Sequence, residues 1–313
     1  MMRRLAAAAL ALYPLAFRRR YAEEMKALLE EAPVRALTVL DLLRGALAAH
    51  LRPGDGPQGV VGVEDRLRAS LSGVLACWIA FAAAGFAFYK TTEDAPFARA
   101  ASAHLALGAS HLVVQALAGA VSLAILAGGL PVALAAMKQA RHRRSLRAPI
   151  GVALGAVGLV CVLTGALVLL AHTPHGVHPT APGRAGFAVW GLAVLAAGVA
   201  FALAARRALF ATSVSRARLL IALATATLAS AAMAVIALAT TAYAVGLGLD
   251  AADLAGTPNG PIGNPSTEAT LAAQVAAMAI TCALAVVTSH RGWRAVSNTA
   301  SGSSPATGDS TRA

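Results

Sequence analysis

The sequence predicts an all-α polytopic membrane protein, with six transmembrane helices preceded by a small amphipathic helical cytoplasmic module. Hydrophobic residues make up 58% of the 313 residues, and charged residues make up only 13%, whereas a soluble domain carries roughly 25% charged residues. The apolar residues also fall in blocks of about 20 or more, the length that a helix needs to cross roughly 30 Å of hydrocarbon. The lipid bilayer is therefore the first expected partner.

Residues 1–52 are expected to form the cytoplasmic module from two or three amphipathic helices. Apolar residues at steps of four, four and three mark one face of a helix that Pro33 ends: Phe17, Tyr21, Met25 and Leu28. A second helix carries leucines in register: Leu40, Leu43, Leu47 and Leu51. These residues are too few to bury a large core alone, so we expect the helices to pack on one another and on the membrane surface.

The sequence of this module is similar to a segment found in other proteins. The string YPLAFRRRYAEEMKALLEEAP, followed by TVLDLLRGALAAHLRP, resembles the N-terminal cytoplasmic prefix of many uncharacterised actinobacterial multi-pass integral membrane proteins. A similar prefix precedes the membrane part of some ABC-transporter permeases. The resemblance implies a membrane protein connected with transport, and it names no substrate. The sequence has no G-x-x-x-x-G-K-[ST] phosphate-binding motif, so a permease of this kind would need an ATPase subunit on a separate chain.

The chain after the module divides at turn-forming residues. The sequence PGDGP breaks the helical pattern, and residues 53–70 are expected to be a linker that leads into the membrane. Residues 71–289 form the predicted transmembrane domain. Its six spans are approximately 71–89, 105–137, 150–171, 186–205, 219–248 and 269–289. Residues 290–313 are rich in Ser, Thr, Gly and Ala toward their end, and we expect a disordered cytoplasmic tail there.

The loop between the second and third spans sets the expected orientation. It holds five basic residues and no acid: Lys138, Arg141, Arg143, Arg144 and Arg147. Short loops rich in Lys and Arg stay on the cytoplasmic side of a membrane. If this loop is inside, 23 of the 26 Lys and Arg residues fall on the same side. The sequence therefore predicts a multi-pass protein of the cell (plasma) membrane with both termini cytoplasmic.

Small and hydroxyl residues in the spans indicate how the helices pack. Four glycines lie on one face of the third span: Gly151, Gly155, Gly158 and Gly165. A face without side chains allows close helix contact. The sequence leaves open whether the neighbour belongs to the same chain or to a second copy, which would make a homo-oligomer. Hydroxyls in the fifth span can bond to carbonyls of their own helix: Thr225, Thr227, Ser230, Thr240 and Thr241.

Five of the eight histidines are expected on the external side of the membrane: His104, His111, His172, His175 and His178. Because imidazole ligates Zn, Cu and Fe, a metal or haem site can be drawn from them. The spacing His-x-x-His-x-x-His is not a standard zinc pattern, and Pro174 and Pro179 favour an extended loop. Polar surface and interfacial histidines are the simpler interpretation, and we expect no cofactor.

The remaining features exclude several functions and leave three open. Basic residues lie at the ends of the apolar runs, and aromatic residues make up only 5%, so we expect no nucleic-acid partner. No catalytic motif indicates an enzyme. The spans contain no Asp, Glu, Lys or Arg well inside them, which disfavours proton coupling.

Three function classes remain. The first is a permease-like, transport-associated subunit without its own ATPase. The second is a membrane-anchored regulatory or scaffold protein that binds a cytoplasmic partner through residues 1–52. The third is a metal- or haem-binding membrane protein that uses the external histidines.

Overall fold

The computed structural model describes residues 2–11, 13, 15–31, 35–51, 62–92, 94–171, 181–257 and 266–301. Helices are the regular elements of this part of the chain, and the predicted all-α polytopic fold is confirmed. The chain divides into two compact units, Met1–Ala69 and Ser70–Ala313.

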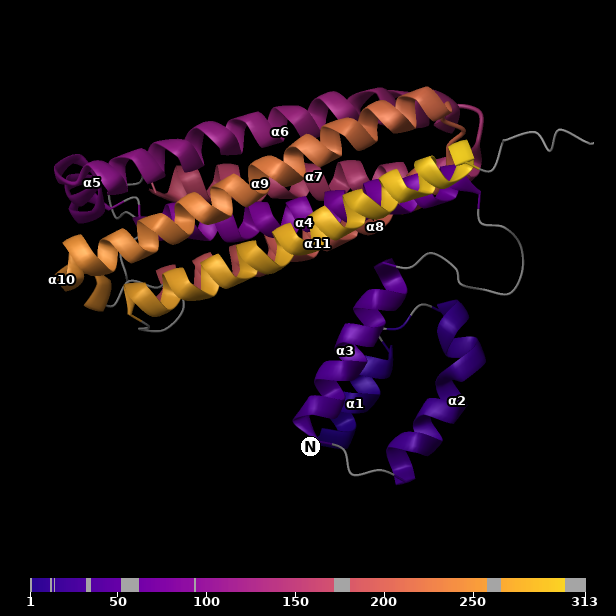
Figure 1. The fold of residues 1–313 in the computed structure, drawn as a ribbon, viewed down its shortest axis with the longest axis horizontal. Coiled ribbons are helices and arrows are strands. Elements are labelled where there is room, and N and C mark those ends of the chain that lie inside the picture. The colour runs from indigo at the N-terminus through magenta and orange to yellow at the C-terminus, as the bar shows by residue number, and fades with distance from the viewer. Residues whose placement is uncertain are drawn as a thin grey trace, which may run out of the picture. The chain divides into compact units, whose positions relative to one another are not determined.

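The first unit packs three short helices around a small core. They are α1 (Met2–Ala11), α2 (Leu15–Glu31) and α3 (Ala36–Leu51), and α1 contacts both of the others (Figure 1). The buried residues of this core are Ala6, Ala9, Tyr13 and Leu42, with Phe17, Met25, Leu29 and Val39 packed against them. The rings of Tyr13 and Phe17 stack with centroids 4.8 Å apart. The unit therefore has an apolar interior of its own, although a small one.

Two leucines expected on the apolar faces of this unit lie off its core. Leu28 is 63% exposed, and Leu29 packs into the core in its place. Leu40 is also 63% exposed, whereas Val39 and Leu42 face the core. The prediction is wrong at these positions because the single helix α1 contacts only a narrow stripe of α2 and α3, and Leu28 and Leu40 lie beside that stripe. The side chains of Leu43, Leu47 and Leu51 lie outside the described residues.

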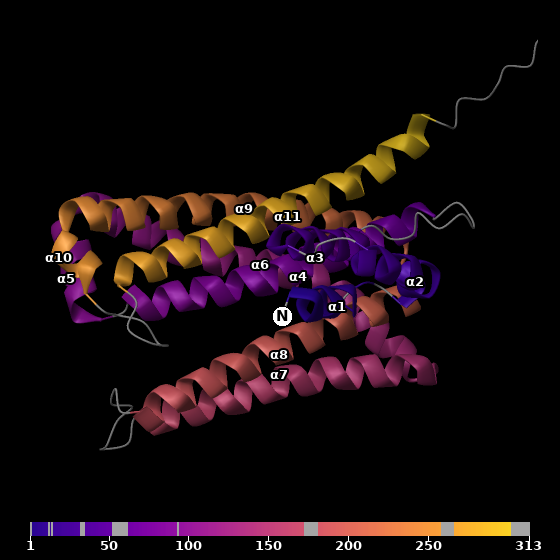
Figure 2. The ribbon, with the colours of Figure 1, turned by 90° about the horizontal axis from the view of Figure 1, so that it is seen from below.

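The second unit contains six helices that are long and apolar enough to cross a membrane, so the described chain is that of a six-span integral membrane protein. They are α4 (Val63–Thr92), α6 (Leu105–Ala140), α7 (Arg144–Ala171), α8 (Ala181–Ala211), α9 (Arg216–Asp250) and α11 (Thr267–Ser301). The short helices α5 (Ala95–Ala103) and α10 (Ala252–Gly256) lie together at one end of the bundle (Figures 1 and 2).

Most of these helices extend beyond the spans that the sequence predicted. With 36 residues, α6 runs about 54 Å at 1.5 Å per residue, well beyond the roughly 30 Å of hydrocarbon. The extension matters most in α11, which continues to Ser301. The prediction of a disordered tail from residue 290 is therefore wrong for residues 290–301, and residues 302–313 lie outside the described part. The last turns of α11 are held on α9, because Trp293 Nε1 donates to Thr227 Oγ1 at 2.9 Å.

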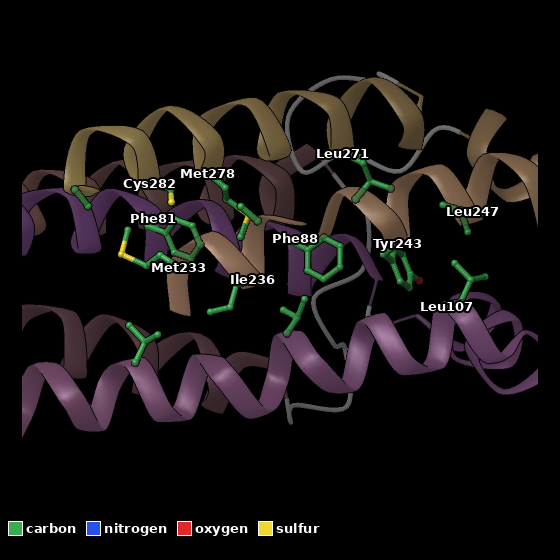
Figure 3. Close-up of a cluster of buried hydrophobic side chains, with 14 of the residues drawn as sticks. Phe81, Phe88, Leu107, Met233, Ile236, Tyr243, Leu247, Leu271, Met278 and Cys282 are labelled. Carbon is green, nitrogen blue, oxygen red and sulfur yellow. The ribbon is translucent and has the colours of Figure 1, made fainter. Parts of the chain in front are cut away.

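Helix α9 lies at the centre of the packed bundle. In the most apolar 18-residue stretch of α9, 44% of the residues are buried, whereas in the corresponding stretch of α7 only 6% are buried. Figure 3 shows Met233, Ile236 and Tyr243 of α9 among side chains of α4, α6 and α11. The ring of Tyr243 meets Phe88 edge to face, with centroids 5.3 Å apart. Since lipid is as apolar as these side chains, van der Waals packing rather than water exclusion holds this core together.

Helices α7 and α8 form a hairpin at the edge of this core, where they lie side by side (Figure 2). The contact of α8 with α4 runs through Gly198, where an added Cβ would lie 2.9 Å from Ile79 Cγ2. Nearer α5, the rings of Phe86 and Trp190 lie 5.1 Å apart. The glycine thus lets the backbone of α8 approach α4 closely.

The hydroxyls of α9 bond to their own helix, as the sequence predicted. Each donates to a carbonyl three or four residues earlier at 2.8–2.9 Å: Thr225, Thr227, Ser230, Thr240 and Thr241. Two of them also link α9 to α11. Thr227 accepts the Trp293 bond, and Ser230 Oγ lies 3.2 Å from Ser289 Oγ. Polar side chains therefore add hydrogen bonds between helices where the core is dry.

Helix α6 does not end at its Gly-Gly-Leu-Pro segment, residues 128–131. It continues through Pro131 to Ala140. Gly128 lies close against α9. An added Cβ there would overlap the side chain of Thr225 and lie 3.5 Å from Ala222 Cα. A Cβ added at the next residue, Gly129, would meet nothing within 4 Å.

We expect Gly128→Leu to destabilise the membrane domain, because the leucine must push α6 away from α9. Overpacking of this kind costs about 1–3 kcal/mol or more. The measurement is thermal unfolding of the purified chain in mild detergent. Gly129→Leu is the matched control, since it makes the same change in an open position. Equal melting temperatures for the two variants would contradict the close α6–α9 contact.

Candidate functional site

Charged side chains of the membrane domain gather at its two ends. We call the connections α6–α7 and α8–α9 and the last turns of α11 the basic end. The described cations there are Lys138, Arg141, Arg143, Arg144, Arg147, Arg206, Arg207, Arg216, Arg218, Arg291 and Arg294. The opposite end, with α5, α10 and the start of α11, is the acidic end; its described carboxylates are Asp94, Asp250, Asp253 and Glu268. Between the two ends, the described helices contain no Asp, Glu, Lys or Arg.

Two side chains organise the basic end. Arg147 donates from Nε to Ala140 O at 3.2 Å and from Nη2 to Arg141 O at 3.1 Å, so it satisfies carbonyls at the end of α6. Gln139 Nε2 donates to Ser213 O at 2.9 Å, and its Oε1 accepts from Ser213 N and Oγ at 3.1 Å each. This amide ties the α6–α7 connection to the α8–α9 connection. The sequence analysis missed Gln139, because nothing in its local pattern points to a residue 74 positions away.

The structure does not bring the predicted histidines together. His104 lies between α5 and α6, with Nδ1 3.9 Å from Asp250 Oδ2. His111 follows seven residues after His104, and its Nε2 lies 2.8 Å from Gln115 Nε2. Because an amide nitrogen only donates, His111 accepts this bond. The other three candidates, His172, His175 and His178, lie outside the described residues.

No metal centre forms among the described residues, since they contain no group of three or more His, Cys, Asp or Glu side chains that could hold an ion. His104 and His111 are therefore not part of such a group within the described chain. The described cysteines Cys77 and Cys282 are buried, and Cys161 is exposed; all three are free.

A buried amide links α4 to α11 in the half of the domain nearer the acidic end. Gln274 is 8% exposed, and its Nε2 donates to Thr91 Oγ1 at 3.0 Å. The Thr91 hydroxyl in turn donates to Ala87 O at 2.9 Å, so the amide must present its nitrogen to Thr91. Gln274 Oε1 is then buried without a partner among the described atoms. A buried glutamine among uncharged residues is a signal that the sequence analysis passed over.

A groove opens between α9 and α11 at the acidic end, with a volume of about 380 Å³. Its walls include Thr241, Ala244 and Gly248 from α9, and Ala272 from α11. Glu268, in the first turn of α11, places a carboxylate at the groove. The groove thus combines apolar walls with one charged group, which is the common composition of a small-molecule or lipid site.

The predicted glycine face of α7 meets open space within the described chain. A Cβ added at Gly151, Gly155, Gly158 or Gly165 would have no neighbour within 4 Å. Helix α7 contacts α8 and buries Ala156, which is not one of these glycines. Contact of the glycine face with a second copy stays a prediction.

Comparisons with protein-family models, with curated proteins and with solved structures found no match to this chain. The fold by itself defines the class, which is that of an integral, multi-pass helical membrane protein. Any finer function must be argued from the residues of the two units.

We expect Gly155→Leu to leave the unfolding temperature of the single chain in detergent unchanged or slightly raised. The new side chain enters open space, and leucine has a higher helix propensity than glycine by about 1 kcal/mol or less. Gly198→Leu is the control, because its side chain would collide with Ile79 and should lower the unfolding temperature.

Light scattering in the same detergent tests for a second copy. Loss of a dimer in Gly155→Leu, with the stability of the single chain intact, would place the glycine face at an interface between copies. A lowered unfolding temperature of a strictly monomeric Gly155→Leu chain would contradict the open position.

Proposed function

We propose that this protein is a permease-like, transport-associated subunit that works with an ATPase on a separate chain, which its first unit recruits. One observation carries the proposal. The first unit has a core of its own and still leaves leucines of its helices in contact with solvent: Leu28 at 63%, Leu37 at 73% and Leu40 at 63% exposure. The resemblance of residues 1–52 to a prefix found before some permeases supports the same proposal.

These leucines belong to neighbouring parts of the first unit. Leu28 lies near the end of α2, and Leu37 and Leu40 lie in the first turns of α3. Exposed charged side chains of both signs accompany them: Glu24, Lys26, Glu31, Arg35 and Asp41. A surface with apolar contacts and charges of both signs around them fits a partner with apolar side chains and a charged rim of complementary pattern.

The distribution of basic residues supports a cytoplasmic location for the first unit. Helix α4 begins at the basic end, where a Cβ added at Gly292 of α11 would lie 3.1 Å from Ser70 Cβ. Residues 1–62 precede this helix in the chain. By the positive-inside rule we assign this end, both chain termini and the first unit to the cytoplasmic side of the cell membrane. A cytoplasmic ATPase or regulator would then reach the first unit directly.

A regulatory or scaffold role is the second candidate, and the same exposed leucines favour it. The two candidates share the docking surface and differ in the partner, which binds nucleotide only in the first. No described residue adds support to the third candidate, a metal- or haem-binding protein.

The test is purification of the full chain from its native membranes in mild detergent, followed by identification of the proteins that remain bound. We expect a subunit with a nucleotide-binding site, with ATPase activity that depends on this chain. The double variant Leu37→Ser and Leu40→Ser should lose the partner and keep its fold, because both side chains are exposed.

Leu5→Ser is the control, since Leu5 is a 44% exposed leucine of α1 in the same unit; it should retain the partner. A bound regulator without a nucleotide site would replace the transport proposal with the regulatory one. Recovery of no cytoplasmic partner, or full binding by the double variant, would contradict both.

A further inference from the structure

We propose that the groove between α9 and α11 binds a phospholipid whose headgroup carries an ammonium group. One acyl chain lies between the two helices, and the ammonium lies beside the carboxylate of Glu268. The groove lies at the acidic end of the membrane domain and includes residues of α9, α10 and α11. The proposal concerns the bilayer and not a cytoplasmic partner, so it holds or fails independently of the proposed function.

The length of the groove suits the upper part of one acyl chain. On α9 it runs from Thr241 to Gly248, and on α11 from Glu268 to Val275. Seven residues of helix rise about 10 Å, which is roughly a third of the hydrocarbon core. Helix α9 ends at Asp250, and α11 begins at Thr267, so the upper end of the groove lies where the lipid headgroups begin.

Small side chains give the groove its depth. An added Cβ at Gly248 meets nothing within 4 Å, and Ala244 and Ala272 contribute only methyl groups. Leu247 and Leu271 close the floor, and each is only 1% exposed. A hydrocarbon chain in this space gains van der Waals contacts along both helices, whereas an empty groove leaves its walls without partner atoms.

The charge at the upper end selects the headgroup. Glu268 is exposed, and Asp250 and Asp253 follow at the ends of α9 and α10. The sequence contains no Lys, Arg or His from residue 219 to residue 289, so the helices that line the groove place no cation of their own at this corner. The described cations elsewhere at the acidic end are Lys90 of α4 and Arg99 of α5. The basic group that the structure places beside this corner is His104, 3.9 Å from Asp250. The ammonium group of a lipid headgroup can pair with the carboxylate of Glu268. A headgroup that carries only a phosphate is repelled by the carboxylates.

The experiment uses the full chain in mild detergent with an equimolar mixture of phosphatidylethanolamine and phosphatidylglycerol. Native mass spectrometry then counts the lipids that stay bound. We expect the unaltered chain to retain phosphatidylethanolamine in preference to phosphatidylglycerol. In Glu268→Gln this preference should fall roughly two- to fivefold, which is the effect of losing one exposed ion pair. Ala272→Leu should abolish retention, because its side chain fills the groove.

Two matched controls accompany these variants. Ala273→Leu changes an exposed alanine of α11 outside the groove, and Asp94→Asn removes an exposed carboxylate of the acidic end that does not line it. Both should retain the lipid and the preference. Gly248→Leu fills the groove from α9, and it replaces Ala272→Leu if that variant fails to give a folded protein.

Several results would overturn the proposal. Equal retention of the two lipids by the unaltered chain would remove the role of the carboxylate. Unchanged retention in both Ala272→Leu and Gly248→Leu would place the lipid elsewhere. A dimer that either groove-filling variant dissociates would show that a second copy, and not a lipid, occupies the groove.

Discussion

The exclusion of charge from the hydrocarbon is the constraint on which the rest of this structure depends. A Lys, Arg or Asp side chain at the centre of a membrane helix costs at least about 2.5–3.5 kcal/mol, and the described helices carry none between their two ends. Most described cations of the membrane domain therefore gather at one end, and the other end holds Asp94, Asp250, Asp253 and Glu268 together with Lys90 and Arg99. This separation fixes which connections of the membrane domain share an end of the bundle.

Without charges or water exclusion to hold the helices together, the membrane domain relies on small residues and hydroxyls. Gly128 lets α6 reach α9, Gly198 lets α8 reach α4, and Gly292 meets Leu223 and Ser70. Hydroxyls first satisfy their own helix and then form a few links between helices, such as Trp293 to Thr227. Where these small residues face no helix, they leave open surface, as in the groove beside Gly248. The same residue types therefore create both the core and the candidate binding site.

Much of the fold follows from the sequence, because hydrophobic runs and turn residues are local signals. They give the six spans, a first unit of two or three helices and the back-bonding of the α9 hydroxyls. Which face of a helix meets which neighbour is not local. The sequence places a glycine face on α7, whereas the glycines that approach other helices within this chain include Gly73, Gly128, Gly198 and Gly292. Leu28 and Leu40 fit an apolar periodicity and still lie off the core, since the core is set by contact with α1.

The candidate sites were less predictable for the same reason. The groove needs residues about 20–30 positions apart on α9 and α11, and Gln139 needs a partner across two membrane helices. Spacing within one helix does not reveal either arrangement. The histidines show the converse, because His104 and His111 share a helix pattern and yet contact different partners, Asp250 and Gln115.

The most direct test of this account is the sidedness of the two ends in intact cells. In a chain whose native cysteines are replaced by serine, a single cysteine is introduced at the basic end by His142→Cys or at the acidic end by Asp253→Cys, both exposed positions. A membrane-impermeant maleimide should label Asp253→Cys in intact cells and His142→Cys only after the membrane is permeabilised. Labelling of His142→Cys from outside, or of both positions without permeabilisation, would contradict the assigned orientation.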